Sequence, residues 1–185
     1  MSKMLVVSAF TLSLLAGCAS SPMHVKPPQV GQPSPSPQAG HLIQFKSVNY
    51  PDRYIRHRNY LGELTPLSSD IDKNDSIFIM RPGLNGKGVS FESINFPGFF
   101  LRHQNYQIKL HKAEADNLYK SDASFIQVKG PVGGVAFESV NYPGHFIRHC
   151  SSKLWIDNNK RGNKACNANP NVFSGDVSFD KLGVN

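Results

Sequence analysis

The sequence predicts an all-β fold, a β-trefoil with three internal repeats of about 46 residues. Three observations lead to this prediction: a nine-residue phrase occurs three times at a constant interval, short alternating segments surround each copy, and no stretch keeps an apolar period of 3.6. The copies of the phrase span residues 49–57, 95–103 and 141–149. Each copy keeps Asn, an aromatic residue, Pro, Arg and His in register, which indicates one unit copied threefold.

Strands are expected on both sides of each phrase. Apolar and polar residues alternate immediately before it, which is typical of a strand with one buried face. The Asn-aromatic-Pro sequence then predicts a turn, because Pro presets one turn position and the Asp or Gly after it tolerates the next. The expected strands outside the phrases are residues 45–48, 91–94, 137–140, 107–111, 153–157, 76–80, 124–129 and 177–181. The repeating Phe45, Phe91 and Phe137 are expected in the core.

The number of copies selects among the all-β architectures. Propellers typically need four or more blades, and solenoid repeats need caps that this chain lacks. Three copies with about twelve short strands fit a six-stranded barrel closed by three hairpins. A β-sandwich is the alternative.

The first 17 residues predict an export signal, with Lys3 before an apolar segment too short to span a bilayer. The sequence Leu15-Ala16-Gly17-Cys18 resembles the lipobox of bacterial lipoproteins. The resemblance implies cleavage before Cys18 and lipidation, including palmitate, of that cysteine. The alternative is an ordinary signal peptide with an incidental cysteine. Ala19 after the cysteine favours the outer membrane, on either its periplasmic or its surface face.

The rest of the chain divides in two. Residues 18–40 are rich in Ser, Gln and Pro and predict an extended tether, whereas residues 41–185 form the expected β-domain. The formal charge of +7 would fit nucleic acid in a cytosolic protein, but export removes that partner. Once Cys18 carries lipid, Cys150 and Cys166 are an even pair in an oxidising compartment, which predicts a disulfide. Two separate thiols are the alternative.

The repeated motif resembles a known family. Ser-Val-Asn-Tyr-Pro, then Ile-Arg-His, then Asp-x-x-Phe further on is similar to the arabinofuranose-binding module of alpha-L-arabinofuranosidase B, carbohydrate-binding module family 42. The resemblance covers about residues 41–181 and implies a β-trefoil whose lobes bind terminal arabinofuranosyl groups through a His and an Asp. The matching pairs, 18, 19 and 27 residues apart, are His57 with Asp75, His103 with Asp122, and His149 with Asp176.

The chemistry of these residue types suits a sugar. A carboxylate accepts hydrogen bonds from neighbouring hydroxyls, an imidazole adds a donor or an acceptor, and an aromatic face covers the apolar side of the ring. Tyr60 and Tyr106 are the expected aromatic platforms of the first two lobes. In the third lobe Ser152 stands at that position, so either Trp155 substitutes or the site is altered. Lys46 stands where the other lobes have Glu, which predicts an altered polar network in the first lobe.

We therefore expect a non-catalytic, carbohydrate-binding surface lipoprotein that recognises arabinofuranosyl side chains of a polysaccharide. No cofactor, metal or nucleic acid is expected, the chain is expected to be monomeric, and its membrane contact is through Cys18. The alternatives are a protein-binding or structural lipoprotein that kept the fold without sugar binding, and alpha-L-arabinofuranosidase activity. The acidic residues repeat with the lobes and do not form the opposed pair of carboxylates that a glycosidase needs.

Overall fold

The computed structural model describes residues 41–160, 166 and 170–184, all within the second of the chain's two units, Pro37–Asn185. The signal segment, Cys18 and the tether lie outside the described residues. The strands are β1 (Leu42–Ser47), β2 (Tyr54–Arg58), β3 (Leu61–Thr65), β4 (Phe78–Pro82), β5 (Val89–Ser93), β6 (Phe99–Gln104), β7 (Gln107–Lys112), β8 (Phe125–Lys129), β9 (Val135–Ser139), β10 (Phe146–Cys150), β11 (Lys153–Asp157) and β12 (Phe179–Gly183). The helices are α1 (Asp70–Asp75), α2 (Asn117–Asp122) and α3 (Pro170–Asp176). In this part of the chain no helix is long and apolar enough to cross a membrane.

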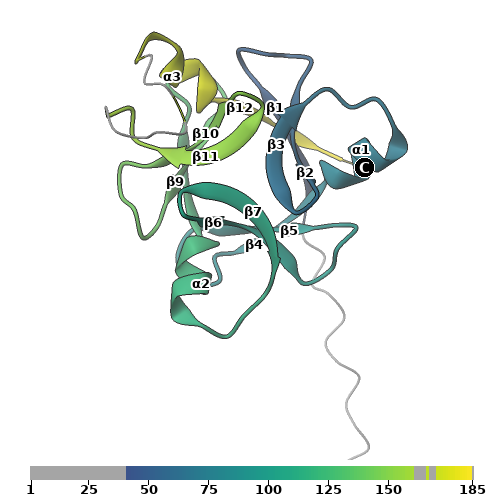
Figure 1. Cartoon of the computed structure of the whole chain (residues 1–185), viewed down its shortest axis with the longest axis vertical. Coiled ribbons are helices and arrows are strands. Elements are labelled where there is room, and N and C mark those ends of the chain that lie inside the picture. The colour runs from purple at the N-terminus through teal and green to yellow at the C-terminus, as the bar shows by residue number, and fades with distance from the viewer. Residues whose placement is uncertain (1–40, 161–165, 167–169, 185) are drawn as a thin grey trace, which may run out of the picture. The chain divides into compact units, whose positions relative to one another are not determined.

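The strands form one antiparallel sheet of 12 strands that closes on itself. Six strands make the ring: β1 pairs with β4 and β12, β5 with β4 and β8, and β9 with β8 and β12. The hairpins β2–β3, β6–β7 and β10–β11 continue from the ring, and β3, β7 and β11 pair with one another. These hairpins surround the centre of the view in Figure 1, and the helices lie outside them.

Three phenylalanines at equivalent positions meet inside the barrel. Phe45, Phe91 and Phe137 are fully buried, and their ring centroids lie 4.9 to 5.2 Å apart in edge-to-face contacts. Such contacts add favourable electrostatics to the apolar burial. The prediction that these residues form the core is confirmed.

The hairpin tips need unusual backbone conformations. Asn59-Tyr60, Asn105-Tyr106 and Ser151-Ser152 all have positive φ, between 48° and 66°. Two consecutive residues of this kind make the two-residue turn that matches the twist of a β-hairpin, and Asn tolerates it well. The turn presents Tyr60 and Tyr106 at the hairpin tips, where each is about half exposed.

Each hairpin is followed by a short helix that sequence periodicity did not predict. The helices have six or seven residues, which is too short for an apolar repeat of 3.6 to be visible. Ser69 and Asp116 cap the first two, since their side chains accept hydrogen bonds from the backbone N–H of Asp72 and Tyr119. All three helices end on the predicted Asp of a His–Asp pair.

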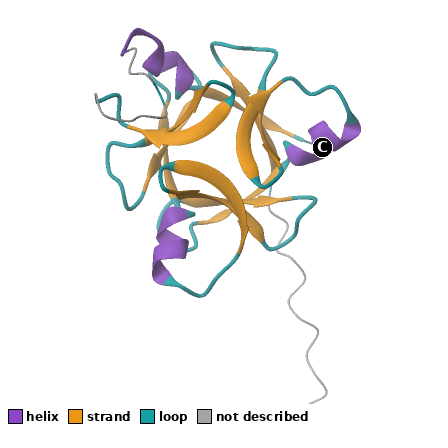
Figure 2. Cartoon of the chain, viewed as in Figure 1, coloured by secondary structure: helices purple, strands orange, loops and turns teal. Residues whose placement is uncertain are grey.

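The all-β class is confirmed, but the prediction of a β-trefoil is corrected to a closed antiparallel β-barrel. We expected a six-stranded barrel with three hairpins added to close it and with each repeat as a unit. The hydrogen bonds instead run through all 12 strands as one continuous sheet, and the pairs β4–β5, β8–β9 and β12–β1 join strands from different repeats. The sequence repeat is therefore not a separate structural unit, because each copy completes its sheet with strands from its neighbours. Figure 2 shows the strands grouped around the middle of the view, with the helices at the periphery.

Candidate functional site

The structure brings each predicted His–Asp pair together. The distance from His Nε2 to Asp Oδ1 is 3.6 Å in the first pair, 3.4 Å in the second and 3.5 Å in the third. We call the surroundings of these pairs the first site (His57 and Asp75), the second site (His103 and Asp122) and the third site (His149 and Asp176). The His comes from the first strand of a hairpin and the Asp from the end of the following helix, and all six side chains are buried.

An asparagine from the next repeat joins the two members of each pair. In the second site Asn141 Nδ2 donates to Asp122 Oδ1 at 2.7 Å, while Asn141 Oδ1 lies 2.9 Å from His103 Nε2. Ser139 Oγ donates to the same amide oxygen at 3.0 Å. This Asn opens the repeated phrase, so it does more than build the turn that we predicted for it.

The other two sites repeat this arrangement. Asn95 joins His57 and Asp75, with distances of 3.0 and 2.8 Å. Asn49 joins His149 and Asp176, with distances of 2.9 Å each, although it lies 100 residues before that His. The third site is therefore completed by the first repeat. Each of the three sites thus takes its asparagine from a neighbouring repeat.

The arginine beside each His holds the carboxylate from the other side. Arg56 Nη2 donates to Asp75 Oδ2 at 2.8 Å, Arg102 Nη2 to Asp122 Oδ2 at 2.5 Å and Arg148 Nη2 to Asp176 Oδ2 at 3.0 Å. All three arginines are buried, so they are internal parts of the sites. One carboxylate oxygen thus faces Arg and the other faces Asn and His, which fixes the orientation of each Asp.

The three histidines are held in the neutral form. Burial lowers the pKa of His57 and His103, and it lowers the pKa of His149 to about 4. Because the Asn amide donates through Nδ2, its oxygen must accept, and His Nε2 therefore carries the proton. No described residue hydrogen-bonds Nδ1 of these histidines, so Nδ1 keeps a lone pair that can accept a hydrogen bond.

Aromatic rings stand beside the first two clusters. The ring of Phe96 lies edge-on to His57 at 5.3 Å, and Tyr60 lies 5.7 Å from Phe96. In the second site Tyr142 lies edge-on to His103 at 5.2 Å, and Tyr106 lies 5.5 Å from Tyr142. The predicted tyrosines are thus linked to the His through a second aromatic ring that we had assigned to the turn alone.

We call the residues that stand beside a His–Asp pair, outside its hydrogen bonds, the wall of the site. The third site differs from the other two in its wall. Tyr50 lies edge-on to His149 at 5.4 Å, as its equivalents do in the other sites, but Ser152 stands where the tyrosine platform would be. Among the described residues, the ring of Trp155 is not in contact with the rings of Tyr50 and His149, and its buried Nε1 has no hydrogen-bond partner. The position of Trp155 therefore gives no support to its substitution for the tyrosine platform.

The predicted disulfide is confirmed. Cys150 directly follows His149, and its sulfur is bonded to that of Cys166, with the two Cα atoms 5.8 Å apart. Cys166 is fully buried. The bond ties the hairpin of the third site to the insertion that lengthens the third repeat.

The residues that sequence reasoning missed are the bridging asparagines and the aromatic residue after each of them. Both types were visible in the repeated phrase, at positions 49–50, 95–96 and 141–142. We explained their occurrence in all three copies by the turn alone. Aligning the copies does not show which neighbouring repeat a side chain contacts. The same misassignment affects Lys46, which we expected to alter the first lobe. It precedes the turn that contributes Asn49 and Tyr50 to the third site.

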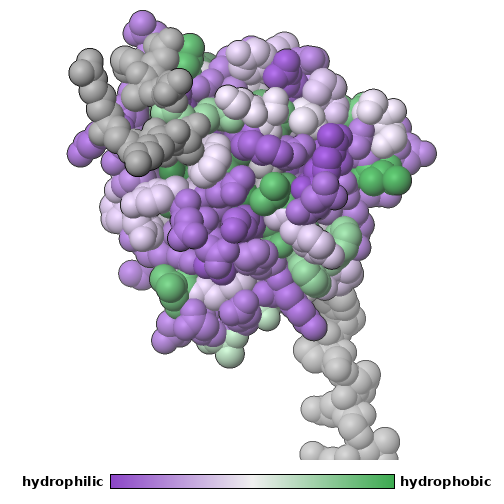
Figure 3. Space-filling model, viewed as in Figure 1, coloured by the Kyte–Doolittle hydropathy of each residue, from purple (hydrophilic) through white to green (hydrophobic). Residues whose placement is uncertain are grey.

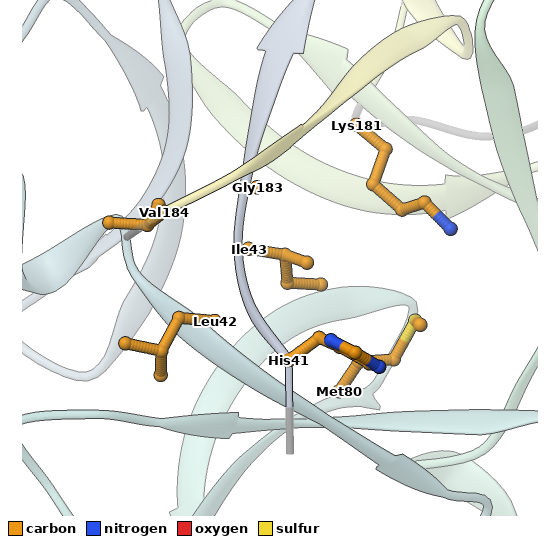
Figure 4. Close-up of a pocket in the computed structure, with 7 residues that line it drawn as sticks. All are labelled: His41, Leu42, Ile43, Met80, Lys181, Gly183 and Val184. Carbon is orange, nitrogen blue, oxygen red and sulfur yellow. The ribbon is translucent and has the colours of Figure 1, made fainter. Parts of the chain in front are cut away.

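The described surface has a hollow that is not formed by these residues. A pocket of about 320 Å³ is lined by His41, Leu42, Ile43, Met80, Lys181, Gly183 and Val184, at the ends of β1 and β12 (Figure 4). Figure 3 shows a largely hydrophilic face on which hydrophobic residues occur in small separate groups. Among the described residues, no group of three or more His, Cys, Asp or Glu side chains is arranged to hold a metal ion.

Each cluster places a few polar groups of fixed orientation beside aromatic rings, which is the kind of lining that small-ligand sites have. Residues 43–180 match the family described as the alpha-L-arabinofuranosidase B (ABFB) domain, and the chain belongs to this family. The resemblance noted in the sequence is thereby confirmed for the family. A comparison with curated proteins gives no match.

Solved structures agree with this assignment. A GH54 alpha-L-arabinofuranosidase soaked with a cyclic sulfate inhibitor is 25% identical with a TM-score of 0.73, over 80% of this chain and 32% of that chain. An arabinofuranosidase complexed with arabinofuranosyl-alpha-1,2-xylobiose is 27% identical with a TM-score of 0.72, over the same shares of the two chains. An endo-β-galactosidase from Clostridium perfringens shares the fold at 10% identity, with a TM-score of 0.60, over 78% of this chain and 33% of that chain. The aligned part of this chain spans about a third of each of these proteins.

Proposed function

We propose that the domain is a non-catalytic module that binds arabinofuranosyl side chains of a polysaccharide at its His–Asp pairs. The observation that carries this proposal is the threefold His–Asp–Asn cluster with an aromatic ring beside it. Family membership supports it, and so does the arabinofuranosidase relative complexed with an arabinofuranosyl-xylobiose. Each cluster offers hydrogen-bonding groups of fixed orientation, which is what recognition of a particular sugar requires.

Each group has a role that its chemistry supports. The Nδ1 lone pair of the neutral His accepts a hydrogen bond from a sugar hydroxyl, and the Asp carboxylate accepts from a neighbouring hydroxyl. Tyr60 and Tyr106 cover the apolar face of the ring in the first two sites. Few sugar atoms would be buried at one site, so affinity for a monosaccharide is weak and retention on a polymer comes from several sites together.

A binding role is favoured over catalysis by the way the carboxylates are used. A glycosidase needs two carboxyl groups across the scissile bond, one of them protonated. Here Asp75, Asp122 and Asp176 are each ion-paired with an arginine and bonded to an asparagine. Two of these arginines also form an ion pair with a second carboxylate: Arg56 with Asp72, and Arg148 with Asp157.

Affinity electrophoresis tests the proposal. The protein is run through gels that contain arabinose-decorated xylan or the same xylan stripped of arabinose, and we expect retardation only by the decorated polymer. Tyr106→Ala removes a half-exposed platform without touching the buried network, and Asp122→Asn removes one carboxylate; each should weaken retardation several-fold. Asp70→Asn is the matched control, because Asp70 is exposed and pairs only with Lys73. Equal mobility in both gels would refute sugar binding.

A protein-binding or structural role without sugar recognition is the second candidate. It is favoured by the burial of the clusters, since His57, Asp75 and their counterparts are bonded to each other and would hold the loops together even without a ligand. Under this hypothesis the decorated xylan leaves the mobility unchanged, whereas Asp122→Asn lowers stability. The gels separate the two candidates, because Asp122→Asn costs stability under both.

We also propose that the domain is anchored by lipid on Cys18 to the outer membrane. The lipobox sequence supports this proposal, and Cys18 lies outside the described residues. Two or more acyl chains give a stable anchor where one is marginal. In a bacterial host that processes lipoproteins, Cys18→Ala should move the protein from the membrane fraction to the soluble fraction. Continued sedimentation of this variant with membranes would contradict the anchor.

A further inference from the structure

The third site has a positively charged wall that the other two lack. Arg53 stands at the position that Phe99 and His145 occupy in the next two repeats. Its guanidinium carbon lies over the ring of Tyr50, 4.8 Å from the centroid, and Tyr50 in turn lies edge-on to His149 at 5.4 Å. The guanidinium is thus placed beside the His–Asp pair of the third site by a stacked aromatic ring.

The guanidinium of Arg53 has unused hydrogen-bonding capacity. Its Nε is buried and has no hydrogen-bond partner. The nearest carboxylate is that of Asp52, whose Oδ1 lies 4.0 Å from Nε, beyond hydrogen-bond distance, and whose side chain is 67% exposed. The arginines beside the three histidines differ from it, because each is buried and bonded to one or two carboxylates. A buried donor without a partner costs free energy. The rest of the side chain, which is 36% exposed overall, remains open to a ligand acceptor.

The surrounding charges favour an anion at the same turn. In the other two repeats a glutamate binds the turn: Glu92 Oε1 accepts from the Gly98 N–H at 2.8 Å, and Glu138 Oε1 from the Gly144 N–H at 2.6 Å. Lys46 takes the place of these glutamates before the turn of Arg53, and its ammonium lies 3.6 Å from Asp180. The turn beside the third site therefore has a lysine in place of the glutamate, and Asp52 stands where the other two turns have Gly98 and Gly144.

The carboxylates at the centre of the third site are already paired. Asp176 Oδ2 accepts from Arg148, and Asp176 Oδ1 accepts from Asn49. Asp157, the other carboxylate of this site, is bonded to Arg148 at 2.5 Å. Ser152 in place of the tyrosine platform leaves a smaller side chain at the hairpin tip.

We propose that the third site binds an acidic saccharide and that Arg53 recognises its carboxylate. The planar fork of a guanidinium matches the two oxygens of a carboxylate, which distinguishes it from a lysine. The inference rests on the proposed sugar-binding function and assigns a different ligand class to one of its sites. The first and second sites, with aromatic residues or His145 at the position of Arg53, take neutral sugars.

Amide-resolved NMR titration of the domain tests this assignment. The probes are methyl β-D-glucuronide, its neutral counterpart methyl β-D-glucoside, and methyl α-L-arabinofuranoside. We expect the glucuronide to shift the resonances around Tyr50 and His149 with about tenfold higher affinity than the glucoside, a preference that weakens at high salt. Arg53→Gln should abolish the preference, and Lys87→Gln, which removes an exposed cation elsewhere, should leave it unchanged.

The outcomes separate this inference from the function on which it rests. Equal affinities for glucuronide and glucoside, or a preference that survives Arg53→Gln, would overturn the acidic site even if the arabinofuranoside shifts the first and second sites. If the arabinofuranoside shifts no site while the glucuronide still binds through Arg53, the proposed arabinofuranose recognition fails and the acidic site stands. Unchanged amide dispersion in Arg53→Gln verifies that the variant is folded.

Discussion

Acidification should destabilise the domain through its buried histidines, and His149→Gln should remove a defined share of this effect. His149 is 5% exposed, and its Nε2 lies 2.9 Å from Asn49 Oδ1 and 3.5 Å from Asp176 Oδ1. Burial is the main cause that lowers its pKa to about 4, and the guanidinium of Arg148 lowers it further while Asp176 opposes the shift. In the unfolded chain the imidazole titrates at about 6.5.

The direction follows from proton binding. Below pH 6.5 the unfolded chain takes up a proton at this His that the folded protein does not bind until the pH reaches about 4. Stability is therefore complete above about pH 6.5 and is lost as the pH falls toward 4. Between pH 7 and pH 5 these two pKa values correspond to a loss of about 2 kcal/mol from His149 alone. His57 and His103, whose pKa values are lowered for the same reason, add to the loss in the wild type.

The assay is urea denaturation of wild type and His149→Gln at pH 7 and pH 5, followed by circular dichroism. Gln keeps an N–H donor near Asn49 and cannot take up a proton. We expect the free energy of unfolding to fall between the two pH values by about 2 kcal/mol less in the variant than in the wild type. His103→Gln is the matched variant in the second site and should also reduce the dependence. An identical pH dependence in wild type and both variants would refute the neutral, buried state of these histidines.

Three further predictions concern stability and use chemical denaturation at pH 7. Asn141→Ala leaves Asp122 without its amide donor and should lower the free energy of unfolding by about 2 kcal/mol; an unchanged value would show that the bridge is not formed. Gly88→Ala should cost about 2 kcal/mol or more, because a Cβ there would lie 2.1 Å from a backbone oxygen, whereas Gly86→Ala, with open space around it, should cost less. Cys150→Ser, which opens a 16-residue loop, should cost about 3 kcal/mol, and reducing agent should affect only the protein that keeps the bond.

The His–Asp pairs were predicted from the family resemblance, and both members of each pair belong to one repeat. His103 lies on a hairpin strand and Asp122 at the end of the next helix, so a local hairpin and one helical turn bring them within 3.4 Å. Three of the strands predicted outside the phrases, residues 107–111, 153–157 and 124–129, coincide with β7, β11 and β8 to within a residue. Local pattern is enough where pairing is local.

What the sequence did not reveal depends on contacts between repeats. Asn141 faces the preceding pair and Asn49 faces a His 100 residues later, and aligned copies look the same whichever neighbour they contact. For the same reason the class was predicted as a trefoil of repeated units, whereas the sheet continues across the repeat boundaries. The helices were missed because six residues cannot display a period of 3.6.

The centre and the wall of the sites are under different physical constraints. At the centre, His, Asp, Arg and Asn are buried and bonded to one another, so replacing one of them leaves a buried charge or donor without a partner and costs stability. The wall residues at equivalent positions are Phe99, His145 and Arg53, and they stand beside the clusters without being part of these bonds. Substitution there changes the chemistry offered to a ligand at little cost to the fold. A domain of this construction can keep three equal centres and still present three different binding surfaces, and the positive wall of the third site follows from that freedom.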